Sequence, residues 1–87
     1  MTPTQETFYA KVQAQMRVNI PLQLYNTMKL KKGDKIKTQI QKIGQTIIGH
    51  NVVKVQPQRR FLISDLSVEI MGLKKGDKLN VTIEKVK

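Results

Sequence analysis

The chain has 87 residues, enough for one domain and too few for two. It contains no cysteine, which excludes disulfides, thiolate catalysis and cysteine metal sites, and its aromatic content of 5% means that Val, Ile, Leu and Met must build the core. The net charge is +10. Such a charge favours polyanionic partners, although solubility or a lysine-rich thermophile surface would explain it as well.

No apolar run approaches the length of a membrane span, and the first residues lack a basic segment followed by an apolar one. We therefore expect a soluble, cytoplasmic protein that has no membrane partner.

The chain contains an internal repeat with a shift of 43 residues. Residues 11–43 align without a gap to residues 54–86, and 15 of the 33 pairs are identical. The block LKKGDK occurs whole at 30–35 and again at 73–78. The repeat indicates two tandem copies, at about 8–44 and 51–87, within a single domain spanning 1–87.

The pattern at the start of each copy predicts two strands. Apolar and polar residues alternate with a period of two over 8–15, which is typical of a half-buried strand. The residues expected to face inward there are Phe8, Ala10, Val12 and Ala14, with Val53 and Val55 in the second copy. A connection of about two residues, at Met16 or Arg59, leads to a second strand. Its inward residues are Val18 and Ile20, or Phe61 and Ile63.

A short helix and a glycine turn follow. Pro21 suits a first helical position, and Ser64 or Asp65 can cap the second helix. The inward residues should be Leu24, Met28 and Leu30, matched by Ser67, Met71 and Leu73. Gly33 and Gly76 should then adopt a left-handed backbone, and Asp34 and Asp77 should accept backbone N–H bonds that lock the turns.

A third strand completes each copy. Its inward residues are Ile36, Thr38 and Ile40, matched by Leu79, Val81 and Ile83. The segment 44–50 (GQTIIGH) joins the copies, and Ile47 and Ile48 indicate that strand continues through it. We expect no domain boundary there.

The segment 17–35 resembles the N-terminal domains of AbrB-type transition-state regulators and MazE-type antitoxins. Their pattern is a strand, a G-R-I-T-I-P segment, a short helix and L-G-L-K-x-G-D-x-V. The matching residues are Arg17, Ile20, Pro21, Leu30, Lys31, Gly33, Asp34 and Ile36, and, in the second copy, Arg60, Ile63, Gly72, Leu73, Lys74, Gly76, Asp77 and Leu79. The chain departs from the pattern at Met16, where the family has glycine, and at Ser64, where it has proline.

The Gly-Asp turn is also a hallmark of the wider cradle-loop barrels, which include double-psi and RIFT barrels. AbrB-type units carry a fourth strand that swaps between two chains, and here each copy has three. The resemblance therefore implies a mainly β fold with two short helices: a monomeric, pseudo-twofold, six-stranded RIFT-like barrel built from two ββαβ units. The short connection between the first two strands argues against the double-psi form.

In AbrB-like regulators basic residues on the first hairpin and nearby loops meet DNA. The resemblance implies that Arg17 and Arg60, with their basic neighbours, contact DNA. The lysines of the Gly-Asp turns could contact phosphate. The candidates are Arg17, Arg59, Arg60, Lys11, Lys54, Lys31, Lys32, Lys74 and Lys75. The competing explanation is that these are solvated residues that protect strand edges or follow helix C-termini.

The sequence shows no catalytic constellation. His50 is a lone histidine that we expect on a strand surface, without a metal, and the serines have no His or Cys companion. No phosphate loop or HExxH motif is present. We therefore expect a non-enzymatic protein without cofactor that binds nucleic acid, most simply duplex DNA, as a regulator or architectural protein. The alternative is a barrel domain with no nucleic-acid role, linking the AbrB, RIFT and double-psi folds. An enzymatic remnant of a RIFT-type riboflavin kinase fits less well.

Overall fold

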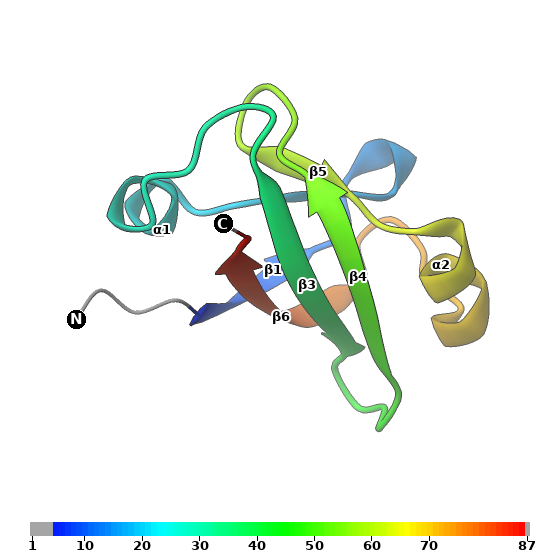
Figure 1. The fold of residues 1–87 in the computed structure, drawn as a ribbon. Coiled ribbons are helices and arrows are strands. Elements are labelled where there is room, and N and C mark those ends of the chain that lie inside the picture. The colour runs from blue at the N-terminus through cyan, green and yellow to red at the C-terminus, as the bar shows by residue number, and fades with distance from the viewer. Residues whose placement is uncertain (1–4, 87) are drawn as a thin grey trace.

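A computed structural model describes residues 5–86, and in it the two copies build matching strands and helices (Figure 1). The first copy forms β1 (Gln5–Lys11), the turn η1 (Ala14–Met16), β2 (Arg17–Asn19), α1 (Leu22–Thr27) and β3 (Lys35–Lys42). The second forms β4 (Ile48–Lys54), β5 (Arg60–Leu62), α2 (Asp65–Met71) and β6 (Lys78–Lys85). Adding 43 to the bounds of β1, β2 and β3 gives those of β4, β5 and β6.

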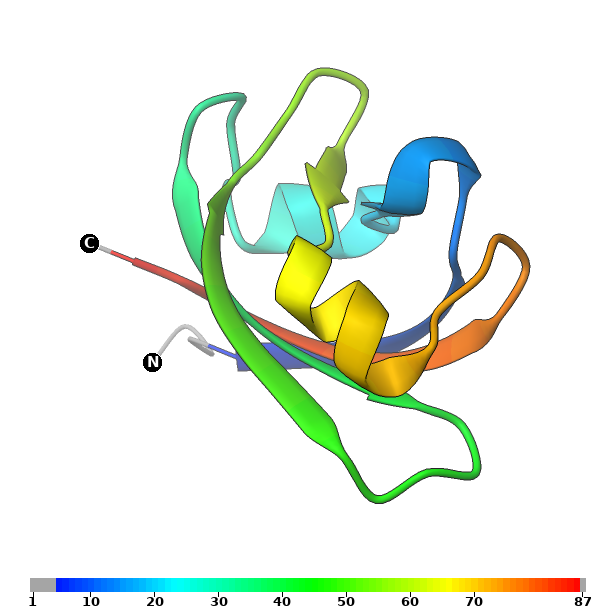
Figure 2. The ribbon, with the colours of Figure 1, turned by 90° about the vertical axis from the view of Figure 1, so that its right-hand side faces the viewer.

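The strands form two antiparallel sheets that interleave the copies. The larger sheet has the order β1-β6-β3-β4, and the smaller one pairs β2 with β5. The register obeys a pseudo-twofold relation, since Gln5 pairs with Glu84 in β1–β6 and the equivalent Ile48 pairs with Gln41 in β4–β3. Figure 2 shows the larger sheet curving beneath the two helices and the β2–β5 pair.

The mainly β class with two helices is confirmed. Closure of the strands into a barrel is not confirmed. The six strands of residues 5–86 belong to two separate sheets and do not form one continuous hydrogen-bonded ring. The RIFT-like topology therefore stays a prediction. None of the helices within the described part of the chain is long and apolar enough to cross a membrane.

The core lies between the two sheets and matches the period-two prediction. Val18 and Phe61 are fully buried on the inner face of the β2–β5 pair, and Thr38 is a buried polar residue of β3 that donates to the Asn51 carbonyl. The buried apolar residues are Phe8, Val12, Val18, Ile20, Met28, Leu30, Ile36, Ile40, Val55, Phe61, Ile63, Met71, Leu73, Leu79, Val81 and Ile83. Ala14 was expected among them, but it is exposed, because the chain leaves the strand at Lys11 and turns through η1.

The helix ends follow local chemistry. Ser64 is the N-cap of α2, and its Oγ accepts the Ser67 N–H at 3.2 Å, as predicted. Pro21 lies one position earlier than expected, as the N-cap of α1 with no side-chain cap. Gly33 and Gly76 have φ of 91° and 93°, so both turns use a backbone conformation that suits glycine.

The join between the copies is a hairpin. Strand β3 ends at Lys42 and β4 begins at Ile48, so only the last part of segment 44–50 is strand and the rest is a turn. His50 is exposed on β4, as predicted.

Candidate nucleic-acid interface

The two arginines related by the repeat lie on the outer face of the β2–β5 pair. Val18 pairs with Phe61, and both are buried, so alternation turns Arg17 and Arg60 to the opposite face. Arg17 pairs with Leu62, which makes Arg60 its diagonal neighbour, at about 7–8 Å between backbones. The fold thus brings together two arginines that are 43 positions apart in the sequence.

Both arginines are half-buried in the same way. The Nε atoms of Arg17 and Arg60 are covered and have no hydrogen-bond partner among the described residues. With the stem packed, an acceptor must meet the guanidinium at its terminal nitrogens, which form the fork that binds phosphate or a guanine edge in pairs. The other outward residues of this pair of strands are Asn19 and Leu62, so its outer face has no carboxylate.

Arg59 belongs to a tight turn beside this pair of strands. Its φ is 57°, and the equivalent Met16 has φ 55°. Met16 is the position at which the AbrB-type pattern has glycine, so the left-handed geometry is present although the glycine is not. The Arg59 carbonyl accepts the Ile20 N–H at 2.7 Å, and the Met16 carbonyl accepts the Ile63 N–H at 2.9 Å. Each turn is thereby fixed against the strand of the other copy.

The lysines form two clusters, and each mixes the two copies. The Val12 N–H donates to the Asp77 carbonyl at 2.9 Å and the Gly76 N–H to the Val12 carbonyl at 2.8 Å, so the end of β1 lies against the second Gly-Asp turn. The bonds Val55–Asp34 and Gly33–Val55 repeat this arrangement. The first lysine cluster is Lys11, Lys74, Lys75 and Lys78. The second lysine cluster is Lys54, Lys31, Lys32 and Lys35.

Lys78 and Lys35 end the two LKKGDK blocks and belong to the lysines of the Gly-Asp turns for which the sequence predicted a phosphate contact. In the register Lys11 pairs with Lys78 and Lys54 with Lys35, so like charges stand directly opposite each other on neighbouring strands. Such pairs are destabilising unless an anion or solvent screens them. The sequence shows the final lysine of each LKKGDK block, but it does not show which residue lies opposite that lysine on the neighbouring strand.

The turn aspartates act as locks, as predicted. Oδ2 of Asp34 accepts the Lys31 N–H at 2.9 Å, and Oδ2 of Asp77 accepts the Lys74 N–H at 2.8 Å. The backbone bond from Lys74, helped by Lys42 at 3.3 Å, lowers the pKa of Asp77 below its ordinary value.

The lysine clusters lie at opposite ends of the arginine pair. Gln13 follows the first cluster, and its N–H donates to the Arg17 carbonyl; Gln56 follows the second, and its N–H donates to the Arg60 carbonyl. Because the pseudo-twofold axis passes between Val18 and Phe61, one cluster borders Arg17 and the other borders Arg60. Along the backbone the candidate residues therefore follow the order first lysine cluster, arginine pair, second lysine cluster, which we call the row. Within it the lysines of β1, β3, β4 and β6 project from the outer face of the larger sheet, and the arginines project from the outer face of the β2–β5 pair.

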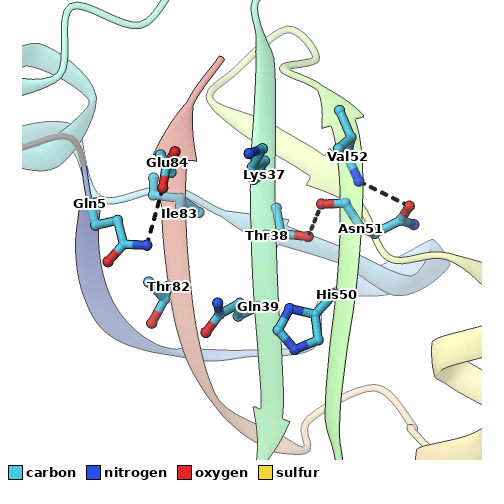
Figure 3. A pocket seen from close by; sticks show the side chains of 10 residues that line it. All are labelled: Gln5, Lys37, Thr38, Gln39, His50, Asn51, Val52, Thr82, Ile83 and Glu84. Atoms are coloured by element: carbon cyan, nitrogen blue, oxygen red, sulfur yellow. Dashed lines mark hydrogen bonds between the residues drawn. The ribbon is translucent and has the colours of Figure 1, made fainter.

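A separate hollow of about 420 Å³ lies on the outer face of the larger sheet (Figure 3). Lys37 stands opposite Glu84, whose Oε1 accepts from Nε2 of Gln5 at 3.1 Å, so the charges there are mixed. His50 faces the same hollow beside Gln39 (Figure 3). Within residues 5–86, no three His, Cys, Asp or Glu side chains gather to hold a metal ion.

No protein-family model and no curated protein sequence matches the chain. Among solved structures it is similar to the solution structure of PHS018 from Pyrococcus horikoshii, with 21% identity and a TM-score of 0.84, over 93% of this chain and 91% of the other. At this level of identity the likeness shows the fold alone.

Proposed function

We propose that the protein binds nucleic acid, with duplex DNA as the target, as a small regulator or architectural protein that is not an enzyme. The observation that carries the proposal is the row formed by the first lysine cluster, the arginine pair and the second lysine cluster. Its two cross-strand lysine pairs lack an opposing carboxylate on the partner position, and a phosphate backbone would relieve their repulsion.

The fold supports duplex DNA over a small anion. A two-stranded antiparallel ribbon fits a major groove about 12 Å wide, and the lysines at both ends of the row then meet phosphates on its walls. The protein extends 35 Å along its longest axis, which corresponds to about ten base pairs at 3.4 Å each. The Gly-Asp turns and the resemblance to AbrB-type domains agree with this assignment, and the six strands with their pseudo-twofold pairing favour a RIFT-like barrel.

The second candidate is a barrel domain without a nucleic-acid role, in which the charge only confers solubility. The mixed charges around Lys37 and Glu84 show that the +10 charge is not confined to one face, which that alternative also predicts.

Fluorescence anisotropy with a labelled 16-base-pair duplex, over a series of salt concentrations, tests the proposal. The double change Arg17→Ala with Arg60→Ala should weaken binding and flatten the slope of log affinity against log salt by about two units, since each phosphate contact contributes about 0.9. Lys37→Ala removes a lysine that stands opposite Glu84 and belongs to neither lysine cluster, so it is the control and should leave both quantities unchanged. Single-stranded DNA and RNA of equal length should bind more weakly. Equal losses in the arginine variant and the control would contradict the proposal.

A further inference from the structure

The two copies share a surface motif that the lysines and arginines do not account for. Both read K-V-Q-x-Q-x-R, at 11–17 and 54–60. Within it Val12 and Val55 are core residues, and the residues between the glutamines differ, with alanine in one copy and proline in the other. The glutamines at positions 15 and 58 are exposed, so packing does not explain why both copies have the same side chain there.

These glutamines sit at the tips of the two turns in a costly backbone conformation. Gln15 has φ 61° and Gln58 has φ 65°, and each is followed by a second left-handed residue, Met16 or Arg59. A left-handed backbone is strained for any residue other than glycine. Glycine would relieve that cost at either tip. The chain instead places a long amide side chain there twice, and such strain is concentrated at functional positions in proteins.

The tips lie between the elements that the proposed function assigns to phosphate. Lys11 precedes the first tip by four residues and Arg17 follows it by two, and the second tip repeats this arrangement with Lys54 and Arg60. The bonds from Ile20 to the Arg59 carbonyl and from Ile63 to the Met16 carbonyl hold both tips against the β2–β5 pair.

We infer that Gln15 and Gln58 read base edges, and that the target is a duplex with two inverted half-sites, each containing an A·T pair. The inference rests on the proposed function and deepens it. A glutamine amide offers one donor group and one acceptor, which match N7 and N6 of adenine in the major groove. Because the tips are related by the pseudo-twofold axis, they meet opposite strands, as the two halves of a palindrome require. Both contacts fall within about ten base pairs, since the protein extends 35 Å.

Selection from a pool of duplexes with 12 randomised base pairs tests the inference, followed by anisotropy on the selected duplex and on a scrambled competitor. The wild type should enrich inverted A·T-containing half-sites. Gln15→Gly with Gln58→Gly should bind the scrambled duplex with unchanged affinity and salt slope, and lose at least about tenfold of the preference for the selected duplex. Because glycine suits the left-handed backbone, this variant should unfold at a higher temperature, so misfolding cannot explain the loss.

Gln23→Ala with Gln39→Ala is the matched control, because it removes two exposed amides from α1 and β3. It should keep the full preference. Duplex binding without sequence preference in the wild type, or a preference that survives in the glycine variant, overturns the inference and leaves the proposed function standing. Absence of duplex binding in the wild type overturns both.

Discussion

The two copies reach the same backbone with different residues at several positions, and the comparison separates what the fold requires from what it tolerates. Lys29 follows α1 with φ 55°, where the second copy has Gly72 with φ 62°. Pro21 is the N-cap of α1 without a side-chain hydrogen bond, where Ser64 caps α2 through its side chain. Glu6 stands on β1 where β4 has Gly49. The two copies therefore reach the same conformation with different side chains at these sites.

Other positions are the same in both copies, for two different reasons. The Gly-Asp turns are retained because their backbone and hydrogen bonds need those residues, as at Gly33 and Asp34. The arginines on the β2–β5 pair and the glutamines at the turn tips are also the same in both copies, and their side chains make no hydrogen bond among the described residues. Their repetition agrees with the binding surface that we propose.

The largest expected effect comes from Gly49, where the copies differ. A Cβ there would lie 2.7 Å from Oγ of Ser67 and 2.8 Å from the methyl carbon of Met71, both buried. Gly49→Ala should therefore lower the free energy of unfolding by about 2 kcal/mol, as overpacking does in other cores. Urea denaturation measures the change. The equivalent substitution Glu6→Ala in the first copy should stay within about 0.5 kcal/mol, and equal costs would show that both helices pack alike.

The two Gly-Asp turns should lose the same free energy of unfolding when their glycine is replaced by alanine. Gly33→Ala and Gly76→Ala should each cost about 1 kcal/mol or slightly more, because φ near 90° excludes a Cβ although no atom lies within 4 Å of either position. The two values should agree within about 0.5 kcal/mol, measured by the same denaturation. A neutral result at both positions would refute the left-handed assignment.

A smaller effect, of opposite sign, is expected after α1. Lys29→Gly gives the first copy the residue of the second and should stabilise the protein by about 1 kcal/mol, because it relieves a left-handed lysine. The thermal midpoint should rise accordingly, and Gly72→Ala should lower it. Destabilisation by Lys29→Gly would mean that the lysine side chain makes a contact worth more than the strain.

Much of the fold could be predicted from the sequence, because the period-two alternation and the turn residues can be read within each copy of the repeat. Val18 and Phe61 could be placed in the core from alternation alone, and Gly76 in a left-handed turn from its position after a helix. The prediction that Ala14 faces the core was wrong, because alternation does not indicate where a strand ends. Sheet closure could not be predicted, since periodicity tells which face is buried and not which strands pair.

The candidate site was predicted by residue type and only partly by arrangement. Arg17 and Arg60 were recognised as a symmetric pair, but their adjacency required the β2–β5 register. Lys11 was expected beside Arg17, whereas the structure pairs it with Lys78 on the neighbouring strand. Contacts between copies depend on the tertiary pairing of strands that are distant in the chain, and no local pattern encodes them.

The most direct test of the account is the affinity of the wild-type protein for a 16-base-pair duplex as a function of salt. Two arginines and at least one lysine from each cluster should contact phosphate, so log affinity should fall with log salt at a slope of about −3.6 or steeper. At physiological salt the dissociation constant should be about 10⁻⁵ M or tighter. A constant weaker than about 10⁻⁴ M, below the usual range even for non-specific binding, would contradict the account and leave the +10 charge as a solubility feature.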